Sequence, residues 1–344
     1  MVRLALMGLD IRQRPWLEAL TALRAAGEVQ LVAAGHASAA TARQTAEFFK
    51  AAGPVPAYDD PRRLMQETTP QVILLDRPAN VGLDFLTACA SQNVGLFSLG
   101  PAVESLAEAQ ALAQILEPRT HLLHIWPHFA DAPAAKRSAQ ADEFLRPIRF
   151  ASATWLGVNY ALAKAATAPG DVPVRSLSVL AWDLLGTLIP LMGVPTTVYA
   201  TIRGTVSGGH SFADISGAAA VTLRFPEDAA ASLTLCDHVA AHDQTVGRRD
   251  LMLWGNGTLR LSAGAYEFRD ESGKLIDAAP PAGDATEPVL DSLRDFLRQF
   301  ALPASPHRGR PHLLEEIAAT LEAMVVSHRT GQPESPDRLR RLRR

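Results

Sequence analysis

The sequence predicts two successive folds: an α/β unit with a parallel sheet, and then a unit built on an open, mostly antiparallel sheet. In the first unit, short apolar runs alternate with segments of helical spacing. In the second, candidate strands follow one another directly, and Asn256-Gly257 is a two-residue hairpin signal between two of them. A chain of 344 residues is long enough for two cores, and we place the domains at 1–120 and 121–344.

The four apolar runs of the first domain are uninterrupted, which is typical of parallel strands that are covered on both faces. We expect these strands at Val2–Met7, Val29–Ala34, Val72–Leu75 and Val94–Phe97. The segments between and after the runs place apolar residues at helical spacing. We expect these helices at Arg14–Ala26, Ala40–Ala52, Pro61–Gln66, Gly82–Gln92 and Glu104–Leu116.

Six segments of the second domain alternate partially between apolar and polar residues, the pattern of half-buried strands. We expect these strands at Arg149–Leu156, Thr197–Ser207, Ala218–Phe225, Ala231–His238, Asp250–Trp254 and Thr258–Ser262. Two helices, Val289–Phe300 and Leu313–Ser327, follow a loop at Ala278–Ala285 that is rich in proline, glycine and alanine. The arginine-rich tail Arg338–Arg344 is interpreted as a solvated, frayed terminus.

Composition favours a soluble globular protein, with 47% hydrophobic residues, 20% charged residues and a net charge of −3. The weakly acidic balance argues against a nucleic-acid partner, and no run approaches the roughly 18 apolar residues of a membrane helix. The two cysteines, Cys89 and Cys236, exclude a disulfide framework and a cysteine-based zinc site. The N-terminus lacks the pattern of a signal peptide, so we predict a cytoplasmic protein.

Several segments, in the right order along the chain, resemble the Gfo/Idh/MocA family of NAD(P)-dependent oxidoreductases. They are Glu28–Leu31 with Thr41–Arg43, Pro101–Ala109, Gly193–Pro195 with Val198–Ala200, and Ser327–Pro333. The resemblance implies a Rossmann-type dinucleotide-binding domain followed by a substrate domain. It also implies association through the open sheet of the second domain, either as a homo-oligomer or by pairing with an active homologue.

The phosphate-binding loop of this family, Gly-x-Gly-x-x-Gly, is matched by residues 8–13, which keep only the first glycine, Gly8. Such glycines let the backbone approach a pyrophosphate at a helix N-terminus. A carboxylate at Asp10 would repel the pyrophosphate by roughly 1 kcal/mol or more, depending on the local dielectric constant. Arg12 would partly offset this repulsion.

Three further positions that serve the cofactor or the substrate in the family are changed. His36 stands at the acidic position that binds the adenine ribose, and Arg77-Pro78 stands at the Thr-Pro turn on the nicotinamide side. Gly100 replaces the lysine that orients the substrate, and glycine has no group that could do so or transfer a proton. The positions that would hold NAD or NADP, if either binds, are therefore Gly8, Asp10, Arg12, His36 and Pro78.

The central helix of the family carries an aspartate and, four residues later on the same face, the acid/base histidine. These two positions hold Val179 and Asp183 here. His128 lies in a segment that resembles the family's basic substrate-contacting stretch. We predict that Asp183 and His128 form a catalytic or ligand-holding pair. The alternative is that Asp183 has a structural role and His128 is an ordinary surface residue.

Two functions remain open, because a fold resemblance alone does not decide between them. The first is an oxidoreductase homologue with degenerate motifs that is not a standard dehydrogenase: it binds a small polar molecule such as a sugar derivative, binds a partner, or has altered chemistry. The second is a divergent NAD(P)-dependent oxidoreductase acting on a sugar, cyclitol or related polyol. No metal site is predicted, because His238 and His242 leave a strand for a loop, where their spacing loses its meaning.

Overall fold

The chain consists of two units of contacting elements in the computed structural model, which describes residues 1–9, 11, 13–76, 81–101, 103–116, 123–125, 145–157, 177–206, 212, 215–237, 249–262, 265–280, 286–301 and 311–343. Unit 1 comprises Met1–Val103, Gln110–Trp126 and Asp284–Pro311. Unit 2 comprises Glu104–Ala109, Pro127–Gly283 and His312–Arg344. Within the described ranges, no helix is both long enough and apolar enough to cross a membrane.

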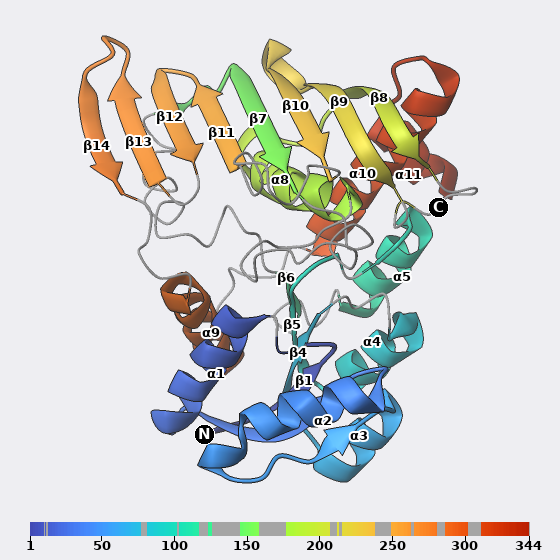
Figure 1. The fold of residues 1–344 in the computed structure, drawn as a ribbon. Helices are drawn as coiled ribbons and strands as arrows, with labels where there is room; N and C mark the ends of the chain where they lie inside the picture. The colour runs from blue at the N-terminus through green and yellow to red at the C-terminus, as the bar shows by residue number, and fades with distance from the viewer. Residues whose placement is uncertain are drawn as a thin grey trace. The chain divides into compact units, whose positions relative to one another are not determined.

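Unit 1 contains a parallel sheet in the order β3-β2-β1-β4-β5-β6 (Figure 1). Its strands are β1 (Val2–Met7), β2 (Val29–Gly35), β3 (Ala57–Tyr58), β4 (Val72–Leu75), β5 (Gly95–Ser98) and β6 (Leu123–Ile125). Every residue of β4 and β5 is buried, as the uninterrupted apolar runs predicted. The strand order reverses between β1 and β4, which is the Rossmann arrangement, so the predicted fold class of this unit is confirmed.

Local sequence supplies side-chain caps for α2 and α3 among the helices of unit 1, whereas α1 and α4 begin without one. They are α1 (Arg14–Ala25), α2 (Ala39–Phe48), α3 (Pro61–Thr68), α4 (Gly82–Ser91) and α5 (Leu106–Leu116), with a short 3-10 turn at Lys50–Ala52. The hydroxyl of Ser38 accepts a hydrogen bond from Thr41 N at the start of α2, and the Asp60 carboxylate accepts one from Arg62 N at the start of α3. The predicted helix positions agree with these bounds to within a few residues.

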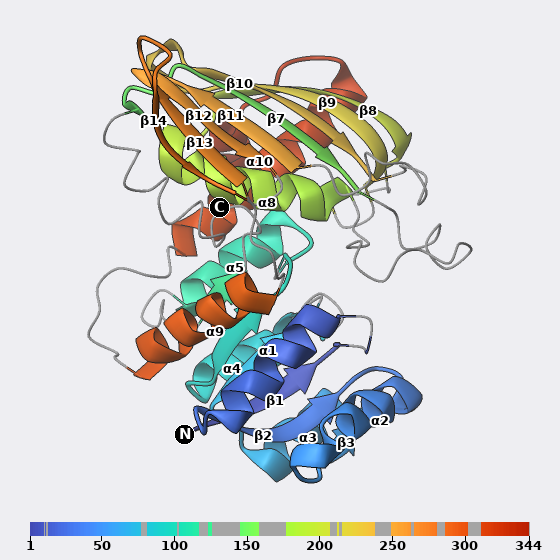
Figure 2. The ribbon, with the colours of Figure 1, turned by 60° about the vertical axis from the view of Figure 1, so that its left-hand side comes forward.

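A helix from the C-terminal part of the chain completes unit 1. Helix α9 (Thr286–Ala301) packs beside α1, on the face of the sheet opposite to α4 (Figures 1 and 2). Phe97 of β5 makes edge-on ring contacts with Trp16 of α1 and Phe296 of α9, at centroid distances of 5.7 and 5.3 Å. The division at residue 120 had placed α9 with the second domain, whereas its contacts put it in unit 1.

Unit 2 contains an eight-stranded sheet in the order β14-β13-β12-β11-β7-β10-β9-β8. Its strands are β7 (Phe150–Leu156), β8 (Thr197–Thr205), β9 (Ser216–Arg224), β10 (Ala230–Cys236), β11 (Arg249–Trp254), β12 (Gly257–Ser262), β13 (Ala265–Asp270) and β14 (Leu275–Ala279). Neighbouring strands are antiparallel except β7 and β10. The predicted open, mostly antiparallel sheet is confirmed, and the predicted loop at 278–285 begins inside β14.

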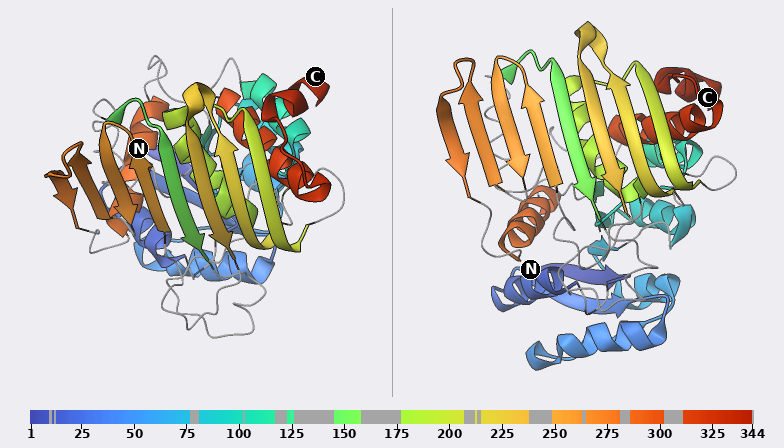
Figure 3. Two further views of the ribbon diagram at one scale, coloured as in Figure 1. Left: turned by 90° about the horizontal axis from the view of Figure 1, so that it is seen from above. Right: turned by 45° about the horizontal axis from the view of Figure 1, so that its top comes forward.

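Helices α8 (Leu177–Met192) and α10 (Pro311–Thr330) lie along one face of this sheet, and no described helix lies on its other face (Figures 1 and 3). The apolar side chains of β9 and β10 are buried and alternate with exposed small or polar ones: the buried set includes Val221, Leu223, Leu233 and Leu235. These apolar residues therefore belong to the chain's own core, and do not indicate a partner surface.

The C-terminal tail is a helix, α11 (Pro336–Arg343), and the prediction of a frayed terminus was wrong. Ser335 accepts a hydrogen bond from Arg338 N at its start, and Arg341 pairs with Asp337 one turn earlier at 2.7 Å. The half-buried Arg340 lies 3.8 Å from Glu315 of α10. The basic run therefore folds because its arginines find carboxylates on α11 and on the neighbouring helix.

Candidate functional site

Gly8, the one glycine kept from the phosphate loop, is held against the end of β4. Its φ is +92°, and a Cβ at this position would lie 2.4 Å from the carbonyl oxygen of Asp76. Gly8 N donates to Gly35 O, and Asp76 N donates to Met7 O. Only glycine fits where the chain leaves β1 beside the end of β4, so its presence follows from packing and is no evidence for a bound phosphate. Asp10 and Arg12 lie outside the described residues.

The start of α1 offers fewer donors than the anion-binding helix of a dinucleotide fold. Pro15 occupies the second position of the helix and has no N–H. The N–H groups of Trp16 and Leu17 both point at Gln13 O, at 3.1 and 3.2 Å. The Leu17 bond is the ordinary first bond of the helix, but the Trp16 N–H is one that a pyrophosphate would need. The sequence carried this signal in Arg14-Pro15, although proline in the first turn is also an ordinary way to begin a helix.

His36 lies at the end of β2, at the expected ribose position, and uses one ring nitrogen locally. Its Nδ1 accepts a hydrogen bond from Ser38 N at 2.9 Å. The neutral ring then carries its proton on Nε2, so it presents a donor where the family presents a carboxylate acceptor. Pro78, on the nicotinamide side, lies outside the described residues.

Gly100 follows β5, at the position of the family's lysine. The Ser98 hydroxyl donates to Gly100 O at 2.6 Å and fixes the turn. A Cβ at Gly100 would meet no atom within 4 Å, so packing does not require glycine here. The position has room for a longer side chain that this chain does not supply.

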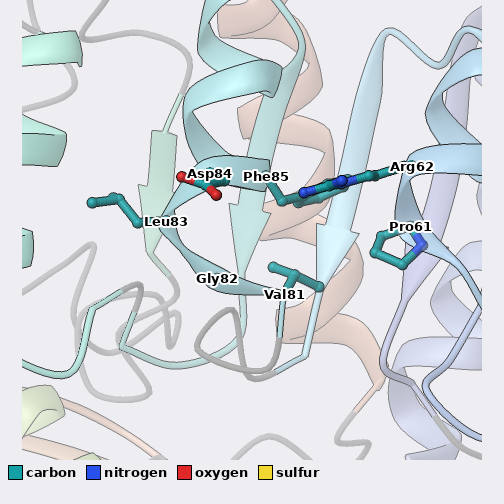
Figure 4. Close-up of a pocket in the computed structure, with 7 residues that line it drawn as sticks. All are labelled: Pro61, Arg62, Val81, Gly82, Leu83, Asp84 and Phe85. Carbon is teal, nitrogen blue, oxygen red and sulfur yellow. The ribbon is translucent and has the colours of Figure 1, made fainter.

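A pocket of about 270 Å³ opens between the first turns of α3 and α4 in unit 1. Both helices follow strands of the parallel sheet, so the pocket lies at the carboxyl edge, where such folds bind ligands. Figure 4 shows the Arg62 side chain extending from α3 in the direction of Phe85, with Val81 and Pro61 along the wall. Its lining is mixed, with one cation, one carboxylate from Asp84 and the apolar side chains beside them.

Asp183 lies on α8 in unit 2 and is only 4% exposed. The start of α8 is held by Asp237, which follows β10 and is fully buried. One oxygen of Asp237 accepts from Leu177 N at 2.9 Å, the other accepts from Gly217 N at 2.7 Å, and its own N–H donates to Gly217 O. A carboxylate at a helix N-terminus is favourable, so Asp237 fixes the helix that carries Asp183.

Arg249, which sequence reasoning did not single out, is a buried cation on which the charge of Asp183 acts. It begins β11, directly across from Trp155 of β7, and its guanidinium carbon lies 5.3 Å from the centre of the indole ring. Burial lowers the pKa of Arg249, and the charge of Asp183 opposes that shift. The only sequence signal was a charged residue at the start of an apolar strand. His128 lies outside the described residues, so its pairing with Asp183 stays a prediction.

In the described part of the chain, no group of three or more His, Cys, Asp or Glu side chains could hold a metal ion. His238 and His242 lie outside it. The described positions offer two chemistries: hydrogen bonding through the Asp183 carboxylate, and binding at the carboxyl edge of the unit 1 sheet.

No protein-family model and no curated protein sequence matches the chain. Solved structures with the same fold do match it. An oxidoreductase from Agrobacterium radiobacter, in complex with NAD+, L-tartaric acid and magnesium, has a TM-score of 0.76 at 14% identity, over 98% of this chain and 99% of that one. Levoglucosan dehydrogenase, in complex with NADH and levoglucosan, has 0.75 at 13% identity, over 97% and 99%. UDP-N-acetylglucosamine 3-dehydrogenase from Acidithiobacillus ferrooxidans has 0.74 at 17% identity, over 96% and 99%.

The similar structures are oxidoreductases of the Gfo/Idh/MocA type, and the likeness covers both units of this chain. The fold expected from the resemblance is therefore confirmed over nearly the whole length. At these identities the likeness shows the fold, and it leaves the cofactor, the substrate and the reaction to be argued from the residues themselves.

Proposed function

We propose that this chain is an oxidoreductase-fold protein that binds a small polar molecule, such as a sugar derivative, at Asp183, and does not act as a standard dehydrogenase. The carrying observation is the carboxylate of Asp183, which is buried on α8. By the family resemblance it stands at the position of the acid/base histidine. A carboxylate accepts hydrogen bonds from hydroxyl groups well, and such groups define sugars and polyols.

The described residues fit a nicotinamide dinucleotide poorly. Pro15 removes a first-turn donor from α1, and Asp76 adds a carboxylate beside Gly8. His36 presents a proton donor to a ribose site that ordinarily contains an acceptor. A bound nicotinamide would supply hydride transfer; the residues that would hold it in this family are the ones that differ here.

The second candidate is a divergent NAD(P)-dependent oxidoreductase of a polyol, and two observations favour it. Two of the similar proteins were solved with a nicotinamide: the Agrobacterium radiobacter oxidoreductase with NAD+ and L-tartaric acid, and levoglucosan dehydrogenase with NADH and either levoglucosan or L-sorbose. The pocket between α3 and α4 also lies at the edge of the sheet where a dinucleotide would extend. In this reading, NAD or NADP binds despite the changed loop, through contacts that differ from those of the family.

Thermal unfolding of the purified chain with titrated ligands separates the two candidates. NAD+, NADH, NADP+ and NADPH form one set, and L-sorbose, levoglucosan and L-tartrate form the other. A ligand at about 100 times its Kd stabilises the folded state by roughly 2.7 kcal/mol, a shift of several degrees in Tm.

We expect a saturable shift with L-sorbose or levoglucosan, lost in Asp183→Asn, and no shift with the four nicotinamides. A saturable nicotinamide shift, abolished by His36→Ala, would establish the second candidate instead. Glu271→Gln, at an exposed residue between β13 and β14, serves as the control for a general effect of removing a carboxylate.

We further propose a homo-oligomer formed through the sheet face of unit 2 that no described helix covers. Small side chains on β9, including Ala218 and Ala220, are exposed there beside Tyr199 of β8. Light scattering at several concentrations would measure the mass. We expect more than one chain per particle, and Ala220→Arg should reduce it to one.

A further inference from the structure

We propose that helix α11 binds the protein to an anionic phospholipid surface, through the exposed side chains of Arg338, Arg341 and Leu342. The contact is peripheral: it involves lipid headgroups and the outer ends of the acyl chains, and it needs no helix that crosses a membrane. The inference goes beyond the proposed function and does not depend on it, because none of these residues belongs to the site on α8.

The charge of the chain is divided unevenly along the sequence. Residues 338–344 contain five of the 33 basic residues and none of the 36 acidic ones, so residues 1–337 carry a formal net charge of −8, from 28 basic and 36 acidic side chains. An anionic surface therefore repels most of the molecule and attracts one short segment. This distribution favours a single orientation, in which α11 faces the surface.

Helix α11 is a folded element that unit 2 holds in place, beside β8 and α10 (Figure 1). The segment before it is fixed to the edge strand, because Val198 and Glu334 exchange two backbone hydrogen bonds of 2.8 Å. Pro336 at its first position is buried, and Arg340 lies 3.8 Å from Glu315 of α10. The helix is therefore formed before any surface is met, and binding does not incur the entropic cost of ordering it.

The spacing of the sequence places two guanidinium groups and one leucine on the outer face of α11. Arg338, Arg341 and Leu342 stand at positions i, i+3 and i+4, which share one side of a helix. Arg338 is exposed, the Arg341 side chain is 80% exposed, and Leu342 is 71% exposed. Arg341 pairs with Asp337 at 2.7 Å, but an ion pair this open to water contributes little, so the guanidinium can exchange it for a phosphate.

The exposed leucine favours a lipid surface over other polyanions. Guanidinium groups bind phosphate with paired hydrogen bonds, whether the phosphate belongs to a phospholipid or to a nucleic acid. Leu342 gains nothing from a nucleic-acid backbone, whereas at the boundary between headgroups and acyl chains its side chain is removed from water. Arginines and an aliphatic residue on one helical face are therefore the pattern of a contact with an anionic lipid surface.

Sedimentation of the full chain with vesicles tests the proposal. The vesicles consist of phosphatidylcholine alone or of phosphatidylcholine mixed with phosphatidylserine, and the salt concentration is raised from about 0.1 M to about 1 M, which shortens the Debye length from about 10 Å to about 3 Å. We expect binding to the vesicles that contain phosphatidylserine, release at high salt, and no binding to the neutral vesicles. No binding to either kind, or equal binding to both, would overturn the proposal.

Variants assign the contact to α11. Arg338→Gln/Arg341→Gln should lower the partition coefficient at least tenfold, because each arginine near the surface contributes about fivefold, and Leu342→Ala should lower it about fivefold. The matched control, Arg43→Gln/Arg63→Gln, removes two exposed arginines from helices of unit 1 and should change nothing; Arg63, like Arg341, pairs with a carboxylate one turn away. Undiminished binding by the α11 double variant would overturn the proposal.

Two further measurements complete the test. Urea unfolding of each variant checks that it folds as the wild type does, and Leu342→Ala, which keeps every charge, tests the apolar contact separately from the charges. Titration with a short DNA duplex tests the other polyanion. Binding to DNA as tight as binding to phosphatidylserine vesicles, and unaffected by Leu342→Ala, would identify a nucleic-acid contact and overturn the proposal of a lipid surface.

Discussion

Gly8 illustrates how one residue can keep a motif position for a reason unrelated to the motif's ligand. Its left-handed φ, and the 2.4 Å distance that a Cβ would have from Asp76 O, both result from the close packing of the end of β1 against the end of β4. A phosphate is not needed to explain it. The later glycines of the loop, which would indicate a phosphate site, are absent from this chain.

We therefore predict that Gly8→Ala destabilises the fold itself. Gly27 is the matched control, because its φ is +70° but a Cβ there would meet nothing within 4 Å. Gly27→Ala should cost about 1 kcal/mol from backbone strain, and Gly8→Ala about 1–3 kcal/mol more from the added clash. Urea unfolding without any ligand measures the free energy of unfolding of both variants. Equal losses of stability would mean that the packing of β1 against β4 at Gly8 relaxes freely.

Cys89 of α4 carries a pH dependence that the structure determines. Burial raises the pKa of its thiol to about 12, from 9.0 in an exposed thiol. Because the folded state holds the proton more tightly, the contribution of Cys89 to stability is complete below pH 9 and is lost as the pH rises toward 12.

Above pH 9, the free energy of unfolding should fall by up to about 1.4 kcal/mol per pH unit on account of this one thiol. The free energy of unfolding of wild type and of Cys89→Ala is compared across that range. The contributions of lysine and tyrosine ionisation are the same in both proteins and cancel in the comparison. The variant should show the shallower slope. Parallel slopes would mean that ionisation of the thiol does not destabilise the folded state.

At the scale of the elements, the C-terminal signature closes the edge of the unit 2 sheet. The outward N–H groups of the edge strand β8 donate to this segment: Val198 N to Glu334 O, Ala200 N to the Ser327 hydroxyl, and Ile202 N to His328 Nδ1. An edge strand left open would present these donors to another chain. Residues 327–333, which helped to suggest the family, therefore act on the fold together with Glu334, by closing this edge.

Ser327→Ala should destabilise the protein by about 1–3 kcal/mol, because both Ser327 and Ala200 are buried and the Ala200 N–H would lose its acceptor. Thr201→Ala, on the exposed face of the same strand, is the control and should change stability by less than about 0.5 kcal/mol. Thermal and urea unfolding supply the measurement. Equal effects of the two substitutions would refute the edge-closing role.

At the scale of the whole molecule, the two units do not coincide with two continuous stretches of sequence. Helix α9 lies more than 150 residues beyond β6 in the chain, yet it completes the core of unit 1 through Phe296, Leu293 and Leu297. Arg294 of the same helix pairs with Glu28 at 2.9 Å. Unit 1 is therefore formed only after most of unit 2 has been synthesised.

Phe296→Ala should consequently destabilise unit 1, although the residue comes from the C-terminal part of the chain. A buried Phe→Ala change costs about 3–5 kcal/mol, and here it also removes the ring contact with Phe97. Hydrogen exchange should accelerate in peptides of β1, β5 and α1 and remain unchanged in β9 and β10. Leu233→Ala, in the core of unit 2, should give the opposite pattern.

Local patterns predicted most of the elements because both signals, periodicity and turn chemistry, act over a few residues. The uninterrupted runs at β1 and β4 and the Asn256-Gly257 hairpin lie where they were expected. Strands β3, β6, β13 and β14 and helix α11 were missed. Their stability comes from neighbours: β14 pairs with β13, and Arg340 lies beside Glu315 of α10. Propensity cannot report such contacts.

For the site, the sequence by itself determined which residue types stand at the family positions: Gly8, His36, Gly100 and Asp183. It could not determine what those residues do, because their roles depend on distances across the fold. Only the tertiary structure decided that Gly8 packs on Asp76, that one nitrogen of His36 is engaged, and that the charge of Asp183 acts on Arg249. The physical reason is that Arg249 lies 66 residues further along the chain than Asp183, and a charge acts through space over ångströms, whatever its separation in sequence.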